Sequence, residues 1–457
     1  MDSKKPTGGL SSGRLFCFFS VALWLFAAHN YLIRELWFDE VLTLKYFASL
    51  PSIPQIYRTY TIPNNQLIHT FFLHGLLNAG FSPEVMRLFP LVCGAGTIIL
   101  LWKNFHRETG KFPLAVTLAA LAFSPPFLLY ATALRGYMLA AFFTVCALCC
   151  GKRYALAGNI HYLAGWFFFS LLTVGVMPSA LAGIAGAGLF ITPYCGKKFW
   201  QNRRLYRLAA APFAAFILFY APIYRDLLKA FELKEGWHHG GYALLAVSVA
   251  VLTTFLIPLA AGIFFHRPAL RNLPRMVIWF LPLAGAVLPV APFPRVWFVL
   301  FPLFALLAAG YLRKVPAPVC RVLIFAAIVW GLVTVPEFSR EILSPAVSLA
   351  GQDDFYAPRF LDKDFRPSST AEFLNNSVAE EVPVFVSFAA DPFALWYFRQ
   401  TVILDIPPGK LRRLPPGTLI VTDREEAPED FGKRFGTALR EIFQNELHRV
   451  YKMEDSE

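Results

Sequence analysis

Two adjacent carboxylates follow the first long apolar run of the chain, in the stretch Trp37-Phe38-Asp39-Glu40. Ionisable side chains at a membrane face are candidates for function, because it is costly to keep a charge beside hydrocarbon. At the end of an apolar run and beside aromatic residues, Asp39 and Glu40 are well placed for a general base. The alternative interpretation is an acidic pair in water at the end of a span. We take this pair as the candidate catalytic site.

Two arginines stand at the edges of other apolar runs. Arg135 lies in the turn Leu134-Arg135-Gly136-Tyr137, and Arg295 begins the apolar run that continues with Val296 and Trp297. Two arginines that converge on one membrane face would make a good phosphate clamp, since a guanidinium group pairs bidentately with phosphate. The alternative for each is an anchor whose charge reaches the membrane interface.

Two further polar segments could contact a substrate. The run Asn64-Asn65-Gln66, followed by His69, offers groups that can bind sugar hydroxyls or phosphate oxygens, or that can simply cap a helix. The Gly-rich loop around His238 and His239 could hold a divalent metal, contact an acceptor or substrate, or lie in water. The sequence therefore leaves a divalent metal as a possibility and indicates no certain cofactor.

The composition is typical of a membrane protein. The chain has 457 residues, of which 56% are hydrophobic and 16% charged, and its mean hydropathy is +0.50. An ordinary soluble domain carries about 25% charged residues. The net charge of +12 would suggest nucleic acid in a soluble protein, but here the basic residues lie in short loops between apolar runs. We therefore expect a lipid bilayer and no nucleic acid as partner. The seven cysteines lie in or beside apolar runs, which indicates helix packing and no disulfide framework.

The apolar runs predict a mainly α-helical, polytopic transmembrane bundle over residues 1–339. Runs of roughly 17–22 residues are long enough to cross a membrane. We expect about eleven spans, near residues 15–33, 88–103, 113–131, 136–151, 161–177, 180–195, 207–223, 242–265, 275–291, 296–312 and 319–336. Residues 64–80 are short and carry two histidines, so we place them as an interfacial helix within a first external loop, 34–87.

The distribution of Lys and Arg predicts the orientation of the bundle. With the N-terminus in the cytoplasm, every cytoplasmic loop is basic, whereas the outer turns carry few basic residues. This orientation places Asp39, Arg135 and Arg295 on the outer face of the membrane. It also places the C-terminal region, 340–457, on the extracytoplasmic side.

Residues 340–457 differ in character from the bundle and predict a small soluble α/β domain. Charges return and prolines punctuate the region. The segments 383–388, 401–406 and 418–423 read as buried strands, and 438–447 reads as a helix. Ser369 to Glu372 looks like a helix start with a capping box. Since no GxGxxG or P-loop pattern occurs, nothing indicates nucleotide binding.

The order of these motifs resembles the GT-C superfamily of membrane glycosyltransferases, and within it the protein O-mannosyltransferase-like and aminoarabinose-transferase-like family. The resemblance covers residues 15–150 well, 290–312 moderately and the middle weakly. It rests on Asp39-Glu40, PNNQLIHTFFLHGLL (63–77), Arg87-Leu88-Phe89-Pro90, Ser124-Pro125, Arg135-Gly136-Tyr137, and Arg295 with FVLFPLFALLAAG (298–310). The chain departs from the family where Pro63-Asn64-Asn65 replaces His-Pro-Pro and where Ala133-Leu134 replaces an acidic residue, so the metal dependence of relatives is not carried over.

The resemblance implies a transferase that uses a polyprenyl-phosphate monosaccharide on the outer membrane face, in the inner membrane if the source is a bacterium. Asp39 would deprotonate the acceptor hydroxyl, which attacks the anomeric carbon with inversion, and Glu40 would orient the acceptor. Arg135 and Arg295 would neutralise the leaving phosphate. The other residues expected in the substrate site are Tyr137, Asn64, Asn65, Gln66, His69, Arg87, His238 and His239. The acceptor, which is a glycan, lipid or protein, stays open.

Two other classes of function compete with this interpretation. A transporter or lipid flippase would place charges near the bilayer midplane and show inverted repeats, whereas the charges here lie at span ends. A non-catalytic scaffold would use the outer domain to bind a partner and would need no closed cavity. The enzyme needs Asp39, Arg135 and Arg295 around one lipid-accessible cavity.

Overall fold

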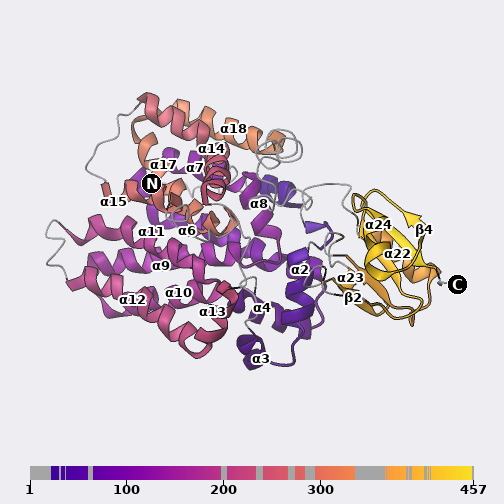
Figure 1. The fold of residues 1–457 in the computed structure, drawn as a ribbon. Coiled ribbons are helices and arrows are strands. Elements are labelled where there is room, and N and C mark those ends of the chain that lie inside the picture. The colour runs from indigo at the N-terminus through magenta and orange to yellow at the C-terminus, as the bar shows by residue number, and fades with distance from the viewer. Residues whose placement is uncertain are drawn as a thin grey trace, which may run out of the picture. The chain divides into compact units, whose positions relative to one another are not determined.

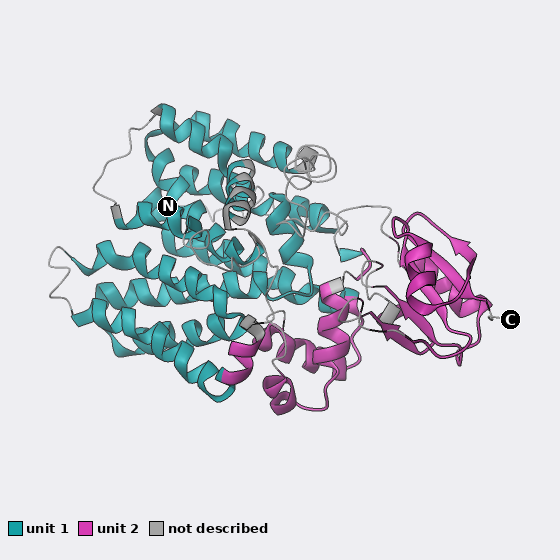
Figure 2. Cartoon of the chain, in the orientation of Figure 1, with its two compact units in different colours: residues 1–33, 84–224, 231–356 teal, residues 34–83, 225–230, 357–457 magenta. Residues whose placement is uncertain are grey.

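The computed structural model shows a mainly helical chain with one small sheet (Figure 1). It describes residues 22–29, 32–36, 38–59, 65–196, 203–232, 240–265, 273–283, 294–334, 366, 368–387, 390, 394–405, 409, 411 and 413–454. These residues divide into two compact units, coloured separately in Figure 2. Unit 1 comprises residues 1–33, 84–224 and 231–356, and unit 2 comprises 34–83, 225–230 and 357–457. The predicted domain boundary at 339/340 lies outside the described residues.

Unit 1 contains the long apolar helices. Residues 22–29 are helical. The α-helices that follow are α5 (Pro83–Met86), α6 (Leu88–Thr109), α7 (Lys111–Ala122), α8 (Pro125–Thr132), α9 (Tyr137–Ala157), α10 (Ile160–Val176), α11 (Leu181–Ile191), α12 (Arg203–Tyr220), α14 (Gly240–Phe265), α15 (Leu273–Val277), α17 (Phe301–Tyr311) and α18 (Ala317–Thr334). Short 3₁₀ segments connect or extend them, namely η2 (Pro178–Ala180), η3 (Thr192–Cys195), η5 (Ala221–Ile223), η7 (Ile278–Phe280), η8 (Pro294–Leu300) and η9 (Leu312–Lys314). Helix α13 (Tyr224–Glu232) follows η5.

Five helical stretches among the described residues are long and apolar enough to cross a membrane: Pro83–Thr109, Tyr137–Ala157, Pro178–Cys195, Arg203–Lys229 and Arg295–Lys314. The pair α7 and α8 makes a sixth if it forms one span. Shorter apolar helices occupy Ile160–Val176, Thr254–Phe264, Pro274–Leu283 and Ala317–Gly331. These helices fall on predicted spans, while the total of about eleven stays a prediction.

The predicted span 113–131 is bent. Helices α7 and α8 meet at an angle of 63°. Ser124 between them is extended, with ψ 144°, and is followed by Pro125 and Pro126. A proline disfavours helical backbone at the residue before it but suits the first turn of a new helix. The Pro-Pro pair therefore ends one helix and begins the next, where the apolar run predicts one continuous span.

Helix α9 packs against α6, α10, α11 and η8, and Figure 1 shows it beside α6, α10 and α11. In the most apolar stretch of α9, 78% of the residues are buried, compared with 28% in the corresponding stretch of Arg203–Lys229, which contains α12. Tight contacts explain the small residues of this core. A side chain at Gly151 of α9 would meet Trp166 of α10 at 2.7 Å, and Trp166 Nε1 donates a hydrogen bond to the carbonyl oxygen of Leu208 in α12. The helix at residues 22–29 joins the core through Trp24, whose Nε1 donates to the carbonyl oxygen of Ala122.

The N-terminal part of unit 2 is a run of short helices: α2 (Phe38–Leu42), the π-helical η1 (Thr43–Ala48), α3 (Ile53–Arg58) and α4 (Leu67–Asn78). Helix α4 has 12 residues, so at 1.5 Å per residue it is about 18 Å long and too short to cross a hydrocarbon core. This length agrees with its placement outside the predicted spans. His74 fastens α4 to η1, because its Nδ1 lies 2.8 Å from the carbonyl oxygen of Ala48.

The C-terminal part of unit 2 is a five-stranded sheet with the order β2-β1-β3-β5-β4. The strands are β1 (Val384–Val386), β2 (Val402–Leu404), β3 (Leu419–Asp423), β4 (Leu439–Gln444) and β5 (His448–Met453), and the helices are α22 (Ser368–Ser377), α23 (Ala394–Tyr397) and α24 (Pro428–Phe435). Strands β2, β1 and β3 are parallel, whereas β5 runs antiparallel to β3 and β4. The three predicted strands are confirmed.

The predicted helix at 438–447 is wrong, because this segment forms β4. Asn445 turns the chain back, since its Oδ1 accepts hydrogen bonds from the backbone N–H groups of Leu447 and His448. The turn lets β4 pair with β5 from Leu439 to Gln444. The backbone hydrogen bonds that a helix would have supplied thus come from a neighbouring strand.

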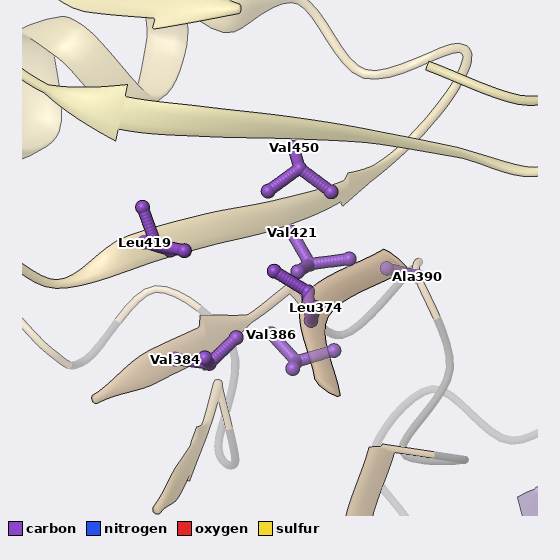
Figure 3. Packing of buried hydrophobic residues seen from close by; sticks show 7 residues of the cluster. All are labelled: Leu374, Val384, Val386, Ala390, Leu419, Val421 and Val450. Atoms are coloured by element: carbon purple, nitrogen blue, oxygen red, sulfur yellow. The ribbon is translucent and has the colours of Figure 1, made fainter. Parts of the chain in front are cut away.

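Apolar side chains cover both faces of the sheet. On one face lie Leu374, Val384, Val386, Ala390, Leu419, Val421 and Val450, which Figure 3 shows converging between the strands and α22. On the other face, Phe385, Ile420 and Tyr451 pack with Phe431 of α24. Since β1 and β3 are buried along their whole length, the alternation of side chains along each strand places apolar groups on both faces. The predicted α/β architecture is therefore present.

Candidate functional site

The candidate residues divide between the two units. Unit 2 contains Asp39, Glu40, Asn65, Gln66 and His69, and unit 1 contains Arg87, Arg135, Tyr137 and Arg295. All nine are buried. Asn64, His238 and His239 lie outside the described residues.

The acidic pair is buried. Asp39 is 5% exposed and Glu40 0%. Both lie in the first turn of α2. The hydroxyl of Thr43, one turn later, donates a hydrogen bond of 2.7 Å to the carbonyl oxygen of Asp39. This burial argues against the interpretation of an acidic pair in water at a span end, and a catalytic role for the pair stays a prediction.

The backbone changes from α-helix to π-helix directly after the acidic pair, where α2 passes into η1 at Thr43. The N–H group of Ser49 donates to the carbonyl oxygen of Leu44, five residues earlier, at 3.0 Å. Turns of π-helix are rare in proteins, and those that occur are often found at functional sites. No clear sequence pattern predicts this turn. It is a second structural feature, beside the burial of Asp39 and Glu40, that marks this segment as a candidate site.

Glu35 and Tyr397, which no sequence pattern indicates, make hydrogen bonds that hold the chain just before the acidic pair. The carboxylate of Glu35 accepts a hydrogen bond of 2.8 Å from the backbone N–H of Ser368 and another from the Ser368 hydroxyl. The backbone N–H of Leu36 donates to the hydroxyl oxygen of Tyr397, at 3.0 Å. Because these contacts span more than 300 residues of chain, no local sequence pattern could reveal them.

The polar residues after α3 are partly explained by structure. Asn65 Nδ2 donates to the carbonyl oxygen of Thr59 at 3.2 Å, and Asn65 Oδ1 accepts from the Thr70 hydroxyl at 3.0 Å. Asn65 therefore ties the end of α3 to the first turn of α4. Gln66 is 3% exposed and His69 0%. A role for these three side chains in substrate binding stays a prediction.

An aromatic cluster joins the segments that carry Arg135 and Arg295. The Tyr130 ring, in α8, lies 4.9 Å from the ring of Tyr137 and 4.9 Å from that of Phe298, measured between centroids. Tyr137 begins α9, two residues after Arg135, and Phe298 lies in η8, three residues after Arg295. These contacts place the two arginine-bearing segments against the same aromatic side chain, and the phosphate clamp itself stays a prediction.

The two arginines themselves are buried. Arg135 is 1% exposed and Arg295 3%. The Arg135 guanidinium carbon lies 5.8 Å from the centroid of the Tyr137 ring, within range of a cation–π interaction. Anchors that extend their charge to the membrane interface would be exposed, so burial of both residues argues against that alternative.

Arg87 has a structural contact. It immediately precedes α6, is 1% exposed, and donates from Nη1 to the carbonyl oxygen of Leu32 at 3.0 Å. Arg87 thus connects the start of α6 to the end of the first apolar run. This contact is structural, and a role for Arg87 in substrate binding stays a prediction.

Within the part of the chain that the structure describes, no three His, Cys, Asp or Glu side chains come together as a metal site. His238 and His239, which suggested a possible metal, are not among these residues.

Comparison with known proteins gives matches in structure. No protein-family model and no curated protein matches the chain. The crystal structure of ArnT from Cupriavidus metallidurans in the apo state is similar, with a TM-score of 0.62 at 16% identity over 97% of this chain and 98% of that one. The ArnT structure bound to undecaprenyl phosphate gives a TM-score of 0.59 at 14% identity, again over 97% and 98% of the two chains.

A second protein has a similar fold. The cryo-EM structure of the arabinofuranosyltransferase AftD from Mycobacteria gives a TM-score of 0.51 at 15% identity, over 98% of this chain and 42% of that one. ArnT, an aminoarabinose transferase, and AftD are both GT-C glycosyltransferases. At these identities the similarity establishes the fold, and the resemblance seen in the sequence is confirmed at that level: the chain has the fold of the GT-C membrane glycosyltransferases along nearly its whole length.

Proposed function

We propose that this protein is a membrane glycosyltransferase that moves a monosaccharide from a polyprenyl-phosphate donor to an acceptor hydroxyl. The observation that carries the proposal is the combination of a GT-C fold over 97% of the chain with a buried acidic pair at Asp39 and Glu40. Buried carboxylates are costly in a membrane protein, so a buried acidic pair is a candidate for function.

The donor phosphate is proposed to bind Arg135 and Arg295. Both guanidinium groups are buried, and their segments pack against Tyr130. A buried guanidinium group binds a phosphate strongly, because the ion pair is weakly screened and the geometry is bidentate. The similar ArnT structure is described as bound to undecaprenyl phosphate, which supports a polyprenyl phosphate as the ligand class. Tyr137 orients Arg135 through its ring.

The reaction is a single displacement. The acceptor hydroxyl oxygen attacks the anomeric carbon, Asp39 takes the hydroxyl proton, and the bond between that carbon and the phosphate oxygen breaks. The electron pair of that bond leaves with the polyprenyl phosphate, whose charge Arg135 and Arg295 stabilise. One displacement inverts the anomeric configuration. Glu40 orients the acceptor or adjusts the basicity of Asp39.

The remaining predicted residues are assigned to substrate binding in the same proposal. They are Asn64, Asn65, Gln66, His69, Arg87, His238 and His239. The site faces the extracytoplasmic side, with the N-terminus in the cytoplasm, and the membrane is the inner membrane if the source is bacterial. This orientation rests on the basic residues of the loops.

Binding of undecaprenyl phosphate tests the donor site. The purified full-length protein in nanodiscs is titrated with undecaprenyl phosphate, and Arg135→Ala and Arg295→Ala are compared with Arg107→Ala. Arg107 is an exposed arginine at the end of α6 and serves as the matched control. Loss of a charge-assisted hydrogen bond costs about 1.5–3 kcal/mol, so each buried-site variant should bind at least about tenfold more weakly. Absence of binding by the wild type, or equal binding by all variants, would reject the proposed donor site.

A further inference from the structure

Glu35 and Tyr397 make hydrogen bonds between two parts of unit 2. One part is the acidic segment, residues 35–48, which contains Asp39 and Glu40. The other is the C-terminal domain, which comprises the five-stranded sheet and its helices α22, α23 and α24. Glu35 accepts hydrogen bonds from the backbone N–H and hydroxyl of Ser368, the first residue of α22. Leu36, next in the chain, donates its N–H to the Tyr397 hydroxyl. Two consecutive residues are therefore held, one through its side chain and one through its backbone, which restricts both the position and the direction of the chain.

The contact with α22 replaces the capping box predicted from the sequence. The N-terminus of a helix leaves backbone N–H groups without helical partners and attracts negative charge. The predicted local cap, Ser369, instead donates its hydroxyl to the carbonyl oxygen of Arg366. The carboxylate of Glu35 supplies the cap from 333 residues away. The end of α22 is thus completed by a residue that lies four positions before Asp39.

A third contact lies on the other side of Asp39. The Lys45 ammonium group, in η1, lies 5.2 Å from the ring centroid of Trp396, in α23. A cation at this distance from the face of an indole ring is attracted to it. The acidic segment is therefore bracketed, with contacts to the C-terminal domain at residues 35–36 and at residue 45.

The two helices that make these contacts, α22 and α23, are connected to each other and to the sheet by side-chain hydrogen bonds. Asn375 of α22 donates from Nδ2 to the carbonyl oxygen of Tyr397 and accepts from the N–H of Arg399 at its Oδ1, which joins α22 to α23. Asn445 donates to the hydroxyls of Ser369 and Thr370, and so joins α22 to the end of β4. Because these side chains cross-link the domain, a displacement of α22 moves both attachment points.

We infer that Glu35 and Tyr397 are positioning residues through which the C-terminal domain holds Asp39 in place for catalysis. Three residues separate Glu35 from Asp39, so the chain can extend at most about 14 Å between them. Small misplacements of a catalytic group lower rates steeply. The C-terminal domain therefore fixes the position of the segment that carries Asp39, and we call this set of contacts, made by Glu35, Leu36 and Lys45, the brace. This inference rests on the proposed role of Asp39 as the general base.

Hydrogen exchange of the full-length protein in nanodiscs tests the brace without any substrate. In Glu35→Ala and Tyr397→Phe, the backbone amides of residues 38–48 should exchange at least about tenfold faster, while those of β1 and β3 stay protected. Glu372→Ala and Tyr46→Phe are the controls, because both side chains are exposed, Glu372 in α22, which Glu35 contacts, and Tyr46 in η1, which follows the acidic pair. Unchanged exchange at residues 38–48 in both variants would overturn the inference.

Activity separates the brace from a purely structural role. The product of the reaction is measured by mass spectrometry in a deletion strain that carries each variant, and binding of undecaprenyl phosphate is measured on the purified protein. Glu35→Ala should lower product formation at least about tenfold with donor affinity unchanged, and Glu35→Gln, which keeps an acceptor for the Ser368 N–H, should restore part of it. Loss of donor binding in parallel with product would contradict the inference.

The outcome for Asp39→Asn distinguishes the two proposals. If Asp39→Asn abolishes product formation and Glu35→Ala and Tyr397→Phe leave it at the wild-type level, the brace is rejected and the proposed function stands. If Asp39→Asn retains product formation, the proposed function fails, whatever the exchange experiment shows.

Discussion

The rings of Tyr130 and Phe298 lie 4.9 Å apart, tilted by 53°. Tyr130 belongs to α8 and Phe298 to η8, more than 160 residues later in the chain. Phe298 also contacts Phe127 and Phe301, so one aromatic cluster connects α8, η8 and α17. The contact matters because it holds the segment of Arg295 against the same ring that supports Tyr137 and the segment of Arg135.

Removing the Phe298 ring should loosen this cluster. Phe298 is 0% exposed, and truncation of a buried Phe to Ala costs about 3–5 kcal/mol. Phe298→Ala should therefore lower the thermal unfolding temperature and weaken undecaprenyl phosphate binding, whereas Phe325→Ala, at a side chain that is 70% exposed, should change neither. A Phe298→Ala protein with wild-type stability and affinity would contradict the role of the cluster.

Two glycines of α11 should respond differently to the same substitution. A side chain at Gly183 would collide with Val299 of η8 and lie 2.9 Å from the Thr144 hydroxyl, whereas Gly188 has nothing within 4 Å. Gly183→Ala should cost about 1–3 kcal/mol by overpacking, and Gly188→Ala should be neutral or slightly stabilising, because Ala favours a helix over Gly. Thermal unfolding in one detergent compares the pair. Equal stability of the two variants would show that α11 does not approach η8 this closely.

The ion pair between Arg434 and Asp405 should stabilise the C-terminal domain. Arg434 Nη1 and Nη2 donate to the two carboxylate oxygens at 2.8 and 2.7 Å, and its Nε donates to the carbonyl oxygen of Leu411. Only 12% of the Arg434 side chain and 6% of that of Asp405 are exposed. Arg434→Ala leaves a buried carboxylate and should cost about 3 kcal/mol, measured by urea unfolding of the full chain. Lys433→Ala, at the exposed neighbour, should be silent, and an equal loss there would deny the ion pair its role.

Glu426 should make the C-terminal domain less stable as pH rises. Burial raises the pKa of Glu426 above its usual value, despite hydrogen bonds from Ser387 and from the N–H of Asp423. The folded domain then binds the proton more tightly than the unfolded chain. The contribution of Glu426 is most favourable below the unfolded pKa of about 4.5, and it is lost as pH rises through the higher folded value.

Glu426→Gln should remove that dependence. The variant should gain stability relative to the wild type above the folded pKa, and the advantage should disappear as pH falls below about 4.5. Urea unfolding as a function of pH measures the difference, with Glu425→Gln as the exposed control. A difference of the opposite sign, or one that is constant with pH, would show that burial does not raise the pKa of Glu426.

Local patterns in the sequence predicted most of the secondary structure. The apolar runs fall on the helices of unit 1, and the β-branched runs at 383–388, 401–406 and 418–423 contain β1, β2 and β3. The errors occur where distant partners decide the outcome. The local pattern of residues 438–447 predicts a helix, but the segment forms β4 because the turn at Asn445 lets it pair with β5. The bend at Ser124 comes from Pro125 and Pro126, which interrupt an apolar run that otherwise predicts one continuous span.

In the candidate site, too, the residues that local patterns indicate differ from those that depend on distant partners. Asp39, Glu40, Arg135 and Arg295 could be selected from the sequence, because charged residues at the ends of apolar runs are conspicuous, and all four are buried. Glu35 and Tyr397 could not, because a carboxylate among other polar residues and an aromatic residue in a soluble domain carry no signal of a contact over hundreds of residues. Long-range hydrogen bonds of this kind become visible only in the folded chain.

The most direct test of the proposed function is mass spectrometry of glycolipids and glycoproteins in a strain that lacks this gene. The strain is complemented with the wild type or with Asp39→Asn at matched expression. The proposal predicts that one sugar modification disappears in the deletion, returns with the wild type and stays absent with Asp39→Asn, while the polyprenyl-phosphate sugar accumulates. Identical profiles in all strains, or full restoration by Asp39→Asn, would contradict it.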